Sequence, residues 1–239
     1  MIERHFAKLR ARSEISTAEE TAIRDAVSEY RDYPADRVVI KRHVELDHST
    51  LLLDGIMCRY KDLRNGERQI TELHVAGDFA DLHSFTLKYL DHSVMTLTPA
   101  HVAIVPHEAL KSITEEFPRL TRIFWFSTNV DAAVHREWEL SLGRRMAVAR
   151  VAMLLCEMQI RLEIVGLGNE NTFDLPLTQT DIAECTGLTN VSVNRTLRQL
   201  REQELVTVQG RTVTLLDKAG LWRLAEFDPT YLYLNKRDR

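Results

Sequence analysis

The stretch "LTQTDIAECTGLTNVSVNRTLRQL", residues 177–200, contains the most specific local pattern in the chain. Thr178 and Asp181 have the spacing of a capping pair at the start of a helix, and Thr189 can cap a second helix. Gly187 stands between the two predicted helices, where a tight turn commonly needs a positive φ. This spacing predicts a helix-turn-helix.

The residues that follow predict a β-hairpin. Two short runs rich in β-branched residues, "ELVTV" (204–208) and "TVTLL" (212–216), flank the turn sequence Gln209-Gly210-Arg211. A glycine in a short connection between such runs is typical of a hairpin. The hairpin would be the wing of a winged helix-turn-helix.

The second predicted helix has one apolar face and one basic face. Each residue advances about 100° around a helix, so Val193, Leu197 and Leu200 share the buried side. Arg195 and Arg198 point away from it, and the second half of the quoted stretch contains no acidic residue. Because the second helix of a helix-turn-helix enters the major groove, we expect this face to bind double-stranded DNA.

Arg195 is the main candidate for reading a base, because arginine can hold guanine through O6 and N7. Val191 could contact no more than a thymine methyl group, and Arg201 lies nearer the buried side than the other two arginines of this helix. Three of the predicted contacts, namely Thr178, Gln179 and Arg211, are weaker candidates that would touch phosphate. The full set of predicted DNA contacts is Thr178, Gln179, Thr189, Asn190, Val191, Ser192, Asn194, Arg195, Arg198 and Arg211.

The N-terminal half has a different pattern. Residues 16–30 open with capping-box spacing and predict a short amphipathic helix. From about 37 to 105, short runs rich in branched residues alternate with turn sequences such as Asp54-Gly55 and Asn65-Gly66. This near-regular spacing predicts an antiparallel jelly roll, a β-barrel able to act as a container.

A long segment without internal proline or glycine follows Pro118, which predicts one helix over 118–142 and a hinge at Gly143. Its apolar residues occur on several sides, so it must pack on more than one neighbour. One interpretation is that it only covers its own barrel, but the spacing favours a helix that also pairs with its copy in a dimer. The predicted dimerisation residues are Leu120, Ile123, Ser127, Val130 and Val134.

Length and composition favour a globular protein with separate domains. The chain has 239 residues, of which 44% are hydrophobic and 28% charged. We expect an α+β protein with a β-barrel domain over 1–117, a dimerisation helix over 118–142 and a DNA-binding domain over 143–239. No window approaches the roughly 18 apolar residues of a membrane span, and the charged start is unlike a signal peptide, which predicts a cytoplasmic location without a membrane partner.

Charge and cysteine content exclude some classes of site. Residues 1–143 contain 18 basic and 23 acidic residues, whereas residues 144–239 contain 13 and 12. A DNA-binding domain can work with so little net charge if its basic residues lie on one face. Cys58, Cys156 and Cys185 form no CxxC pair, so neither a disulfide framework nor a metal site is predicted.

The order of barrel, long helix and winged helix-turn-helix resembles the Crp/Fnr family of bacterial transcription regulators, over about residues 15–217. The specific matches are "LRNGERQITELHVAGDF" (63–79), which is similar to the family's hairpin and Gly-Asp-Phe turn, and the stretch quoted first. The resemblance implies a cyclic-nucleotide-binding-like sensor domain. It also implies a homodimer on a palindromic operator, with RNA polymerase as a protein partner.

The sensor half departs from the cyclic-AMP type of this family. That type has a Gly-Glu pair after the turn and later an Arg-Ser pair, whose arginine neutralises the cyclic phosphate. Here Ala80-Asp81 and His92-Ser93 stand in their places, so the phosphate would lose its permanent cation and tight cyclic-AMP binding is not expected. The predicted effector pocket consists of Asp78, Ala80, Asp81, Leu82, His83, His92 and Ser93.

Two other sensor types of the family are distinguished by their ligands. An iron–sulfur cluster needs about four cysteines, and this chain has no N-terminal cysteine group. Carbon-monoxide sensors of the family place a haem-ligating histidine a few residues after the same turn, as His83 stands here. A haem also needs a second axial ligand, so no cofactor is predicted and haem on His83 is kept as an alternative.

The leading hypothesis is a sequence-specific transcription regulator controlled by a signal sensed in the barrel. Familiar relatives carry glutamate at the position of Val191, so we expect a different operator base pair there. The alternatives are a cyclic-nucleotide- or haem-dependent regulator of the same fold, and a receptor or adaptor that no longer binds DNA. No enzyme is predicted, because the sequence has no nucleophile elbow, phosphate-binding glycine loop or HExxH pattern.

Overall fold

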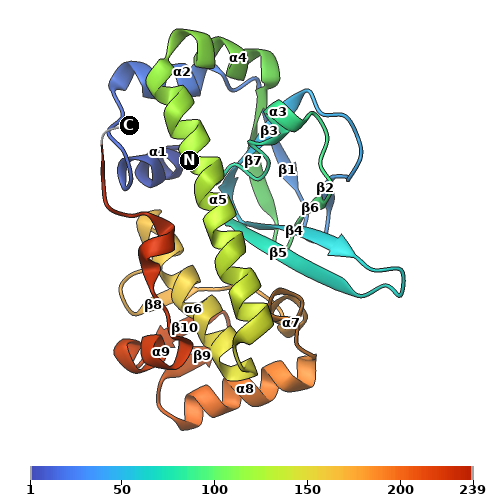
Figure 1. Cartoon of the computed structure of the whole chain (residues 1–239), viewed down its shortest axis with the longest axis vertical. Helices are drawn as coiled ribbons and strands as arrows, with labels where there is room; N and C mark the ends of the chain where they lie inside the picture. The colour runs from blue at the N-terminus through green and yellow to red at the C-terminus, as the bar shows by residue number, and fades with distance from the viewer. Residues whose placement is uncertain (1, 238–239) are drawn as a thin grey trace. The chain divides into compact units, whose positions relative to one another are not determined.

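The computed structural model describes residues 2–237, which form two compact units (Figure 1). Unit 1 comprises the described residues of 1–61, 72–133 and 233–239, and unit 2 comprises residues 62–71 and 134–232. Both units contain helices and strands, which agrees with the predicted α+β class. Neither unit is one continuous piece of the chain.

Unit 1 contains two antiparallel sheets, with the strand orders β1-β7-β3 and β2-β6-β4-β5, except for residues 62–71 between and within β4 and β5, which belong to unit 2. The turns at Asp54-Gly55 and Asn65-Gly66 join β3 to β4 and β4 to β5, and both glycines have a positive φ. The segments rich in branched residues between about 37 and 105 form strands, as predicted. The strands are β1 (Glu29–Tyr33), β2 (Val38–Ile40), β3 (His48–Asp54), β4 (Ile56–Asp62), β5 (Arg68–Val75), β6 (Ser93–Thr96) and β7 (Ala100–Pro106).

Strand β3 supplies side chains to two separate cores. Leu51 and Leu53 belong to a core shared with the helices, whereas Leu52 belongs to a core between the sheets that also contains Met57 and Val94. Because side chains alternate between the faces of a strand, a strand buried on both faces needs apolar residues at successive positions. The helices over the outer face are α1 (Glu3–Arg10), α2 (Thr17–Asp25), α4 (His107–Glu116) and α5 (Pro118–Arg144) (Figure 1).

The predicted helix over 16–30 is too long. α2 starts after Ser16 with the expected capping box to Glu19, but it ends at Asp25. Strand β1 then begins at Glu29 and pairs with β7 at the edge of its sheet. The side chains of β1 are exposed or half-buried, so the sequence has no apolar alternation that would predict a strand there.

The Gly-Asp-Phe turn after β5 packs against α1 and leads to the short helix α3 (Ser84–Leu87). Gly77 has a φ of +97°, and a Cβ atom there would lie 2.8 Å from the carbonyl oxygen of Arg4. Burial lowers the pKa of His5 to about 4, so its neutral ring can donate from Nδ1 to the carbonyl oxygen of Gly77 at 2.8 Å. The positive φ of residue 77 and the close approach of Arg4 both require glycine at this position.

Helix α5 confirms the predicted long helix, but Gly143 is not a hinge. Gly143 lies in the last turn of α5, and the chain changes direction at Met146, which has a ψ of 159° before α6 (Ala147–Ile164). Four of the five predicted dimerisation residues are buried within the protomer and Ser127 is half-buried. Two of the four, Leu120 and Ile123, belong to the core of unit 1.

Unit 2 contains the predicted helix-turn-helix and wing. Strands β9 (Val206–Gln209) and β10 (Thr212–Leu215) form the expected hairpin, and β8 (Thr172–Asp174) adds a third strand beside β10. The three residues of β8 are too few to show a strand pattern in the sequence. The helices are α6, α7 (Gln179–Thr186), α8 (Asn190–Glu202), α9 (Lys218–Ala225) and the 3₁₀ helix η1 (Pro229–Leu232).

Glu157 of α6 is the polar centre of unit 2. Its buried carboxylate accepts hydrogen bonds from Arg161 Nη1 at 2.9 Å, Trp138 Nε1 at 3.0 Å and the Tyr231 hydroxyl at 2.7 Å. Burial and the adjacent carboxylate raise the pKa of Tyr231 far above its usual value, so the hydroxyl keeps its proton and donates. These bonds join α5, α6 and η1.

Each unit also receives a short segment from a distant part of the chain. In unit 2, Gln69 Nε2 donates to the carbonyl oxygen of Glu184 at 2.6 Å, near the end of α7. In unit 1, the backbone N–H of Arg237 donates to the carbonyl oxygen of Arg12 at 3.1 Å. The Tyr233 ring meets the Phe126 ring edge-on at a centroid distance of 6.0 Å.

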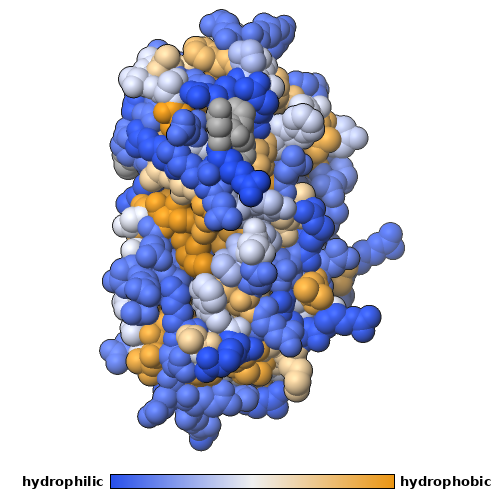
Figure 2. Space-filling view, turned by 60° about the vertical axis from the view of Figure 1, so that its left-hand side comes forward, coloured by the Kyte–Doolittle hydropathy of each residue, from blue (hydrophilic) through white to orange (hydrophobic). Residues whose placement is uncertain are grey.

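Most of the face in Figure 2 is hydrophilic, with a large apolar area left of centre and smaller ones elsewhere among the polar side chains. Large exposed apolar residues include Trp125 and Leu140 on α5 and Val191 on α8. Within residues 2–237, no helix combines the length and apolar composition that crossing a bilayer requires.

Candidate functional site

Local hydrogen bonds set the positions of the two helices of the helix-turn-helix. The Thr178 hydroxyl accepts from the Asp181 N–H at 3.1 Å, and the Asp181 carboxylate accepts from the Thr178 N–H at 2.7 Å. Gly187 ends α7 with a φ of +62°, and the Thr189 hydroxyl accepts from the Ser192 N–H at 3.2 Å. The predicted caps and turn are confirmed.

Helix α8 buries one side and exposes the other, as expected. Val193, Thr196 and Leu200 are buried, whereas Leu197 is only half-buried, so Thr196 takes the place predicted for Leu197. Arg201 is exposed, as are Arg195 and Arg198. The outward face includes the exposed residues Val191, Asn194, Arg195 and Arg198.

The outward face borders a shallow groove of about 450 Å³, and all six lining residues are predicted DNA contacts. One comes from α7 and five from α8, and none is acidic. Guanidinium and amide groups are the donors that suit phosphate oxygens and base edges. The lining residues are Gln179, Asn190, Val191, Asn194, Arg195 and Arg198.

The remaining predicted DNA contacts lie at the helix caps and the wing. The Thr178 hydroxyl donates to the Asp181 carboxylate at 2.7 Å, and the Thr189 hydroxyl donates to Ser192 Oγ at 3.0 Å. These hydroxyls therefore already have acceptors within the protein. Arg211 is exposed in the turn between β9 and β10.

Two groove residues have protein partners that the sequence pattern did not reveal. Arg198 Nε donates to Glu202 Oε1 at 2.7 Å, one helical turn away, and both side chains are exposed. Asn190 Nδ2 donates to Thr180 Oγ1 at 3.1 Å. Glu202 lies just beyond the stretch without acidic residues, so its negative charge partly compensates the positive charge at the C-terminal end of the basic face.

The predicted effector-pocket residues lie close to α3, and most of their polar groups bind other parts of unit 1. The buried Asp81 carboxylate accepts from the Thr50 N–H at 2.6 Å and from Ser84 Oγ at 3.1 Å. Ser93 Oγ accepts from the Arg42 N–H at 3.2 Å. Ala80 and Leu82 are also buried.

The two histidines of this region face each other. The rings of His83 and His92 have centroids 5.5 Å apart, and His92 Nδ1 lies 2.9 Å from Asp91 Oδ1. Burial lowers the pKa of His92. In the part of the chain that the structure describes, no group of three or more His, Cys, Asp or Glu side chains is arranged to hold a metal ion.

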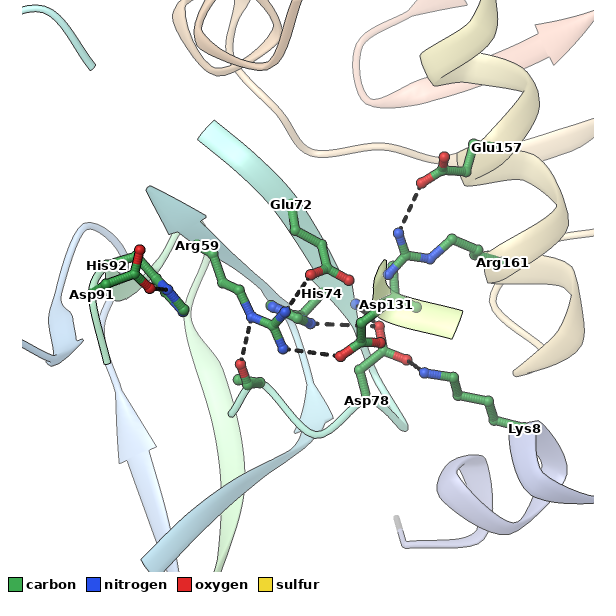
Figure 3. Close-up of polar contacts among 12 residues, drawn as sticks. Lys8, Arg59, Glu72, His74, Asp78, Asp91, His92, Asp131, Glu157 and Arg161 are labelled. Carbon is green, nitrogen blue, oxygen red and sulfur yellow. Dashed lines mark hydrogen bonds and ion pairs between the residues drawn. The ribbon is translucent and has the colours of Figure 1, made fainter. Parts of the chain in front are cut away.

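A buried ion-pair cluster lies beside these residues (Figure 3). Arg59 of β4 is 2% exposed, and its guanidinium donates from Nη1 to Glu72 Oε2 at 2.5 Å and from Nη2 to Asp131 Oδ2 at 3.1 Å. Its Nε donates to the carbonyl oxygen of Ala80 at 2.9 Å. One side chain therefore links β4, β5, α5 and the loop that holds the predicted pocket.

Carboxylates outnumber the cations around Arg59. Lys8 of α1 pairs with Asp78, and Figure 3 shows this pair next to Arg59 and Glu72. Burial raises the pKa of Asp81 to about 6, and burial beside Glu72 raises that of Asp131 to about 6. Such surroundings disfavour an anionic ligand.

Comparison with known proteins agrees with this geometry. The profile of the cyclic nucleotide-binding domain matches residues 30–117, and that of the Crp-like helix-turn-helix domain matches residues 149–224. The nitrogen fixation regulation protein FixK of Bradyrhizobium diazoefficiens is 30% identical over 175 residues, which are 73% of this chain and 72% of that protein. The chain belongs to the Crp/Fnr family.

Other relatives of this Crp/Fnr protein bear regulatory names. Transcriptional activator protein FnrL of Cereibacter sphaeroides is 27% identical over 208 residues, 85% of this chain and 83% of that protein. The structure of FixK2 from Bradyrhizobium japonicum superimposes with a TM-score of 0.75 at 26% identity, and the match covers 82% of this chain and 96% of that one. The family consists of DNA-binding transcription regulators and not of enzymes, so the chain is a regulator of this kind.

The Arg59 cluster is the part of the Crp/Fnr sensor that sequence reasoning missed. One signal existed: Glu72 shares a strand face with the apolar Ile70, which predicts a charged residue pointing inward. Arg59 stands in the same relation to the apolar Met57 of β4, two residues earlier on the same strand face. Asp131 lies on a helix far along the chain, and only the fold brings it to Arg59.

Proposed function

We propose that this Crp/Fnr regulator binds a palindromic operator as a homodimer, with one α8 in the major groove of each half-site. The groove along α8 supports this proposal, because its six lining residues combine two arginines, three amides and one apolar group without an acid. A two-fold dimer places the same face of α8 on both half-sites. RNA polymerase is the proposed protein partner, because FnrL bears the name of a transcriptional activator and activation of transcription acts on that enzyme.

The proposed roles divide the contacts into base readers and phosphate contacts. Arg195 is the main base reader, with Val191 and Asn194 beside it. Arg211 on the wing would touch phosphate. The other phosphate or base contacts would be Thr178, Gln179, Thr189, Asn190, Ser192 and Arg198.

We propose that α5 also forms the dimer contact. Since Leu120 and Ile123 are occupied in the core of unit 1, the support comes from the outward side of α5, where Trp125 is 69% exposed. The proposed division keeps a sensor domain over 1–117, a dimerisation helix over 118–142 and a DNA-binding domain over 143–239.

We propose that the signal acts on the sensor at Asp78, Ala80, Asp81, Leu82, His83, His92 and Ser93, and that it is not a cyclic nucleotide. The nearby guanidinium of Arg59 is already shared by Glu72 and Asp131, so it does not offer a cyclic phosphate a free cation. Cyclic AMP should therefore leave the melting temperature unchanged, whereas a true effector should raise it. A Soret band in protein incubated with haem would support the alternative at His83 instead.

The test of DNA binding is fluorescence anisotropy with operator fragments selected from genomic DNA, measured at several salt concentrations. Arg195→Ala should weaken discrimination at one base pair by roughly 5- to 150-fold, the range of one bidentate contact. Arg211→Ala should instead weaken binding to all sequences alike and reduce the slope of log K against log salt by about one. Equal base preferences in wild type and Arg195→Ala would refute the assignment of Arg195.

A further inference from the structure

The outward side chains of α8 differ in whether they are already engaged within the protein. Thr189 binds Ser192, Asn190 donates to Thr180, and Arg198 donates to Glu202. Among the described residues, Asn194 and Arg195 have no such side-chain partner, and both are exposed. These two groups can therefore bind a base without first breaking an internal bond.

Val191 stands one helical turn before them and is 80% exposed. Residues three and four apart share a helix face, so Val191, Asn194 and Arg195 form one continuous stripe, and all three line the groove. A valine offers neither donor nor acceptor. The 5-methyl group of thymine is the only apolar group that a base pair presents in the major groove.

Asn194 and Arg195 have complementary chemistry. A carboxamide donates and accepts at once, which matches N7 and the N6 amino group of adenine, whereas a guanidinium donates twice, which matches O6 and N7 of guanine. Four residues of a helix span about 6 Å and a base-pair step about 3.4 Å. The stripe therefore covers about two base-pair steps.

We propose that α8 reads each half-site through three different chemistries: guanine by Arg195, adenine by Asn194, and the methyl group of a thymine, within about two steps of the guanine, by Val191. This inference rests on the proposed function and specifies its operator. At the Val191 position, recognition is by a methyl group and not by a hydrogen bond.

The first experiment removes only that methyl group. High-affinity duplexes are selected from a random pool, and each thymine of the half-site is replaced in turn by deoxyuridine. One replacement should weaken wild-type binding about fourfold, since burying a methyl-sized group contributes about that factor. Val191→Ala should bind the thymine and uracil duplexes equally.

Two further variants test the base assignments. Val191→Glu should change the preferred pair at the methyl-sensitive position to one with cytosine, because a carboxylate accepts from N4. Asn194→Ala should lose its preference for adenine over 7-deazaadenine at the neighbouring position. Leu216→Ala is the matched control, because it shortens another exposed apolar side chain of unit 2 outside α8 and should alter none of these preferences.

The outcomes separate this inference from the function on which it rests. Binding without sensitivity to any thymine methyl group, or equal sensitivity in wild type and Val191→Ala, overturns the reading by Val191 and leaves operator binding intact. No salt-dependent binding to any duplex overturns the operator function itself, and the inference with it.

Discussion

At the scale of single residues, Glu157 is the residue on which unit 2 depends most. Its buried carboxylate satisfies three donors, and the charge of Arg161 is compensated by it within the same helix. Glu157→Ala leaves a buried guanidinium without its carboxylate, and we expect the free energy of unfolding to fall by about 3–5 kcal/mol. Urea denaturation of the full chain, followed by circular dichroism, measures this change.

Glu163→Ala is the control for that prediction. Glu163 also lies on α6 and accepts a hydrogen bond from Gln159, but its side chain is exposed. Its loss should cost less than about 1 kcal/mol. A similar loss in both variants would contradict the central role of Glu157.

Asp81 is expected to make the stability of the sensor depend on pH. Burial raises its pKa from 3.8 to about 6, so between about pH 4 and 6 the folded chain holds a proton that the unfolded chain has released. The contribution of this group to the free energy of unfolding therefore falls as the pH rises through that window. Asp81→Asn should remove this loss. The free energy of unfolding of the variant, relative to that of wild type, should therefore rise by on the order of 3 kcal/mol between pH 4 and pH 7.

Asp91→Asn should show the opposite trend. The hydrogen bond from Lys61 lowers the pKa of Asp91, so its stabilising contribution is present above the unfolded pKa and is lost as the pH falls. Melting temperatures of wild type and both variants, measured from pH 2 to 7, decide the matter, because the Asp91 contribution is lost below about pH 4. If the melting temperatures of wild type and Asp81→Asn changed in parallel with pH, Asp81 would not have the raised pKa assigned to it.

At the scale of elements, Arg59 ties two strands to the long helix. Arg59→Met leaves Glu72 and Asp131 without their cation, so we expect a loss of about 3–5 kcal/mol in the free energy of unfolding. Lys61→Met removes a cation from the same strand, but its pair with Asp91 is exposed and should be worth no more than about 1 kcal/mol. The double variant Arg59→Met, Glu72→Gln should recover part of the lost free energy of unfolding, because Glu72 is then no longer charged. If the losses of the two single variants simply added up in the double variant, Arg59 and Glu72 would not interact directly.

Elements fixed by neighbouring residues could be predicted from the sequence, and those fixed at long range could not. The caps at Thr178 and Thr189 and the turn at Gly187 depend on contacts within four residues, and all three are confirmed. Strand β1 depends instead on pairing with β7, about 70 residues away, and its own side chains show no strand pattern.

The candidate sites show the same division. The groove along α8 follows from helix periodicity, and the structure brings its six predicted residues together. The Arg59 cluster joins three elements that are distant in the chain, so local spacing could place Glu72 on an inward face but could not reveal its partners. The apolar residues of α5 were recognised, but periodicity alone does not tell whether a core or a second protomer covers them.

At the scale of the whole molecule, the proposed dimer depends on the outward side of α5. Trp125→Glu places a charge on a side chain that is 69% exposed in the protomer, so folding should survive while a dimer contact there would not. We expect light scattering to show a mass close to the 27.6 kDa of one chain, and operator affinity to fall at least tenfold. Leu87→Glu, at another exposed apolar residue of unit 1, should leave the mass of the assembly unchanged.

The return of residues 233–237 to unit 1 has a consequence for the order of events during synthesis. Unit 1 cannot form its backbone contact between Arg12 and Arg237 until residue 237 has left the ribosome, although most of its residues emerge much earlier. Unit 2 must likewise retain residues 62–71 from the early part of the chain. Each unit thus includes a segment that is synthesised together with most of the other unit. Ribosome-attached fragments that stop at residue 133 should therefore be more sensitive to protease than unit 1 of the full 239-residue chain.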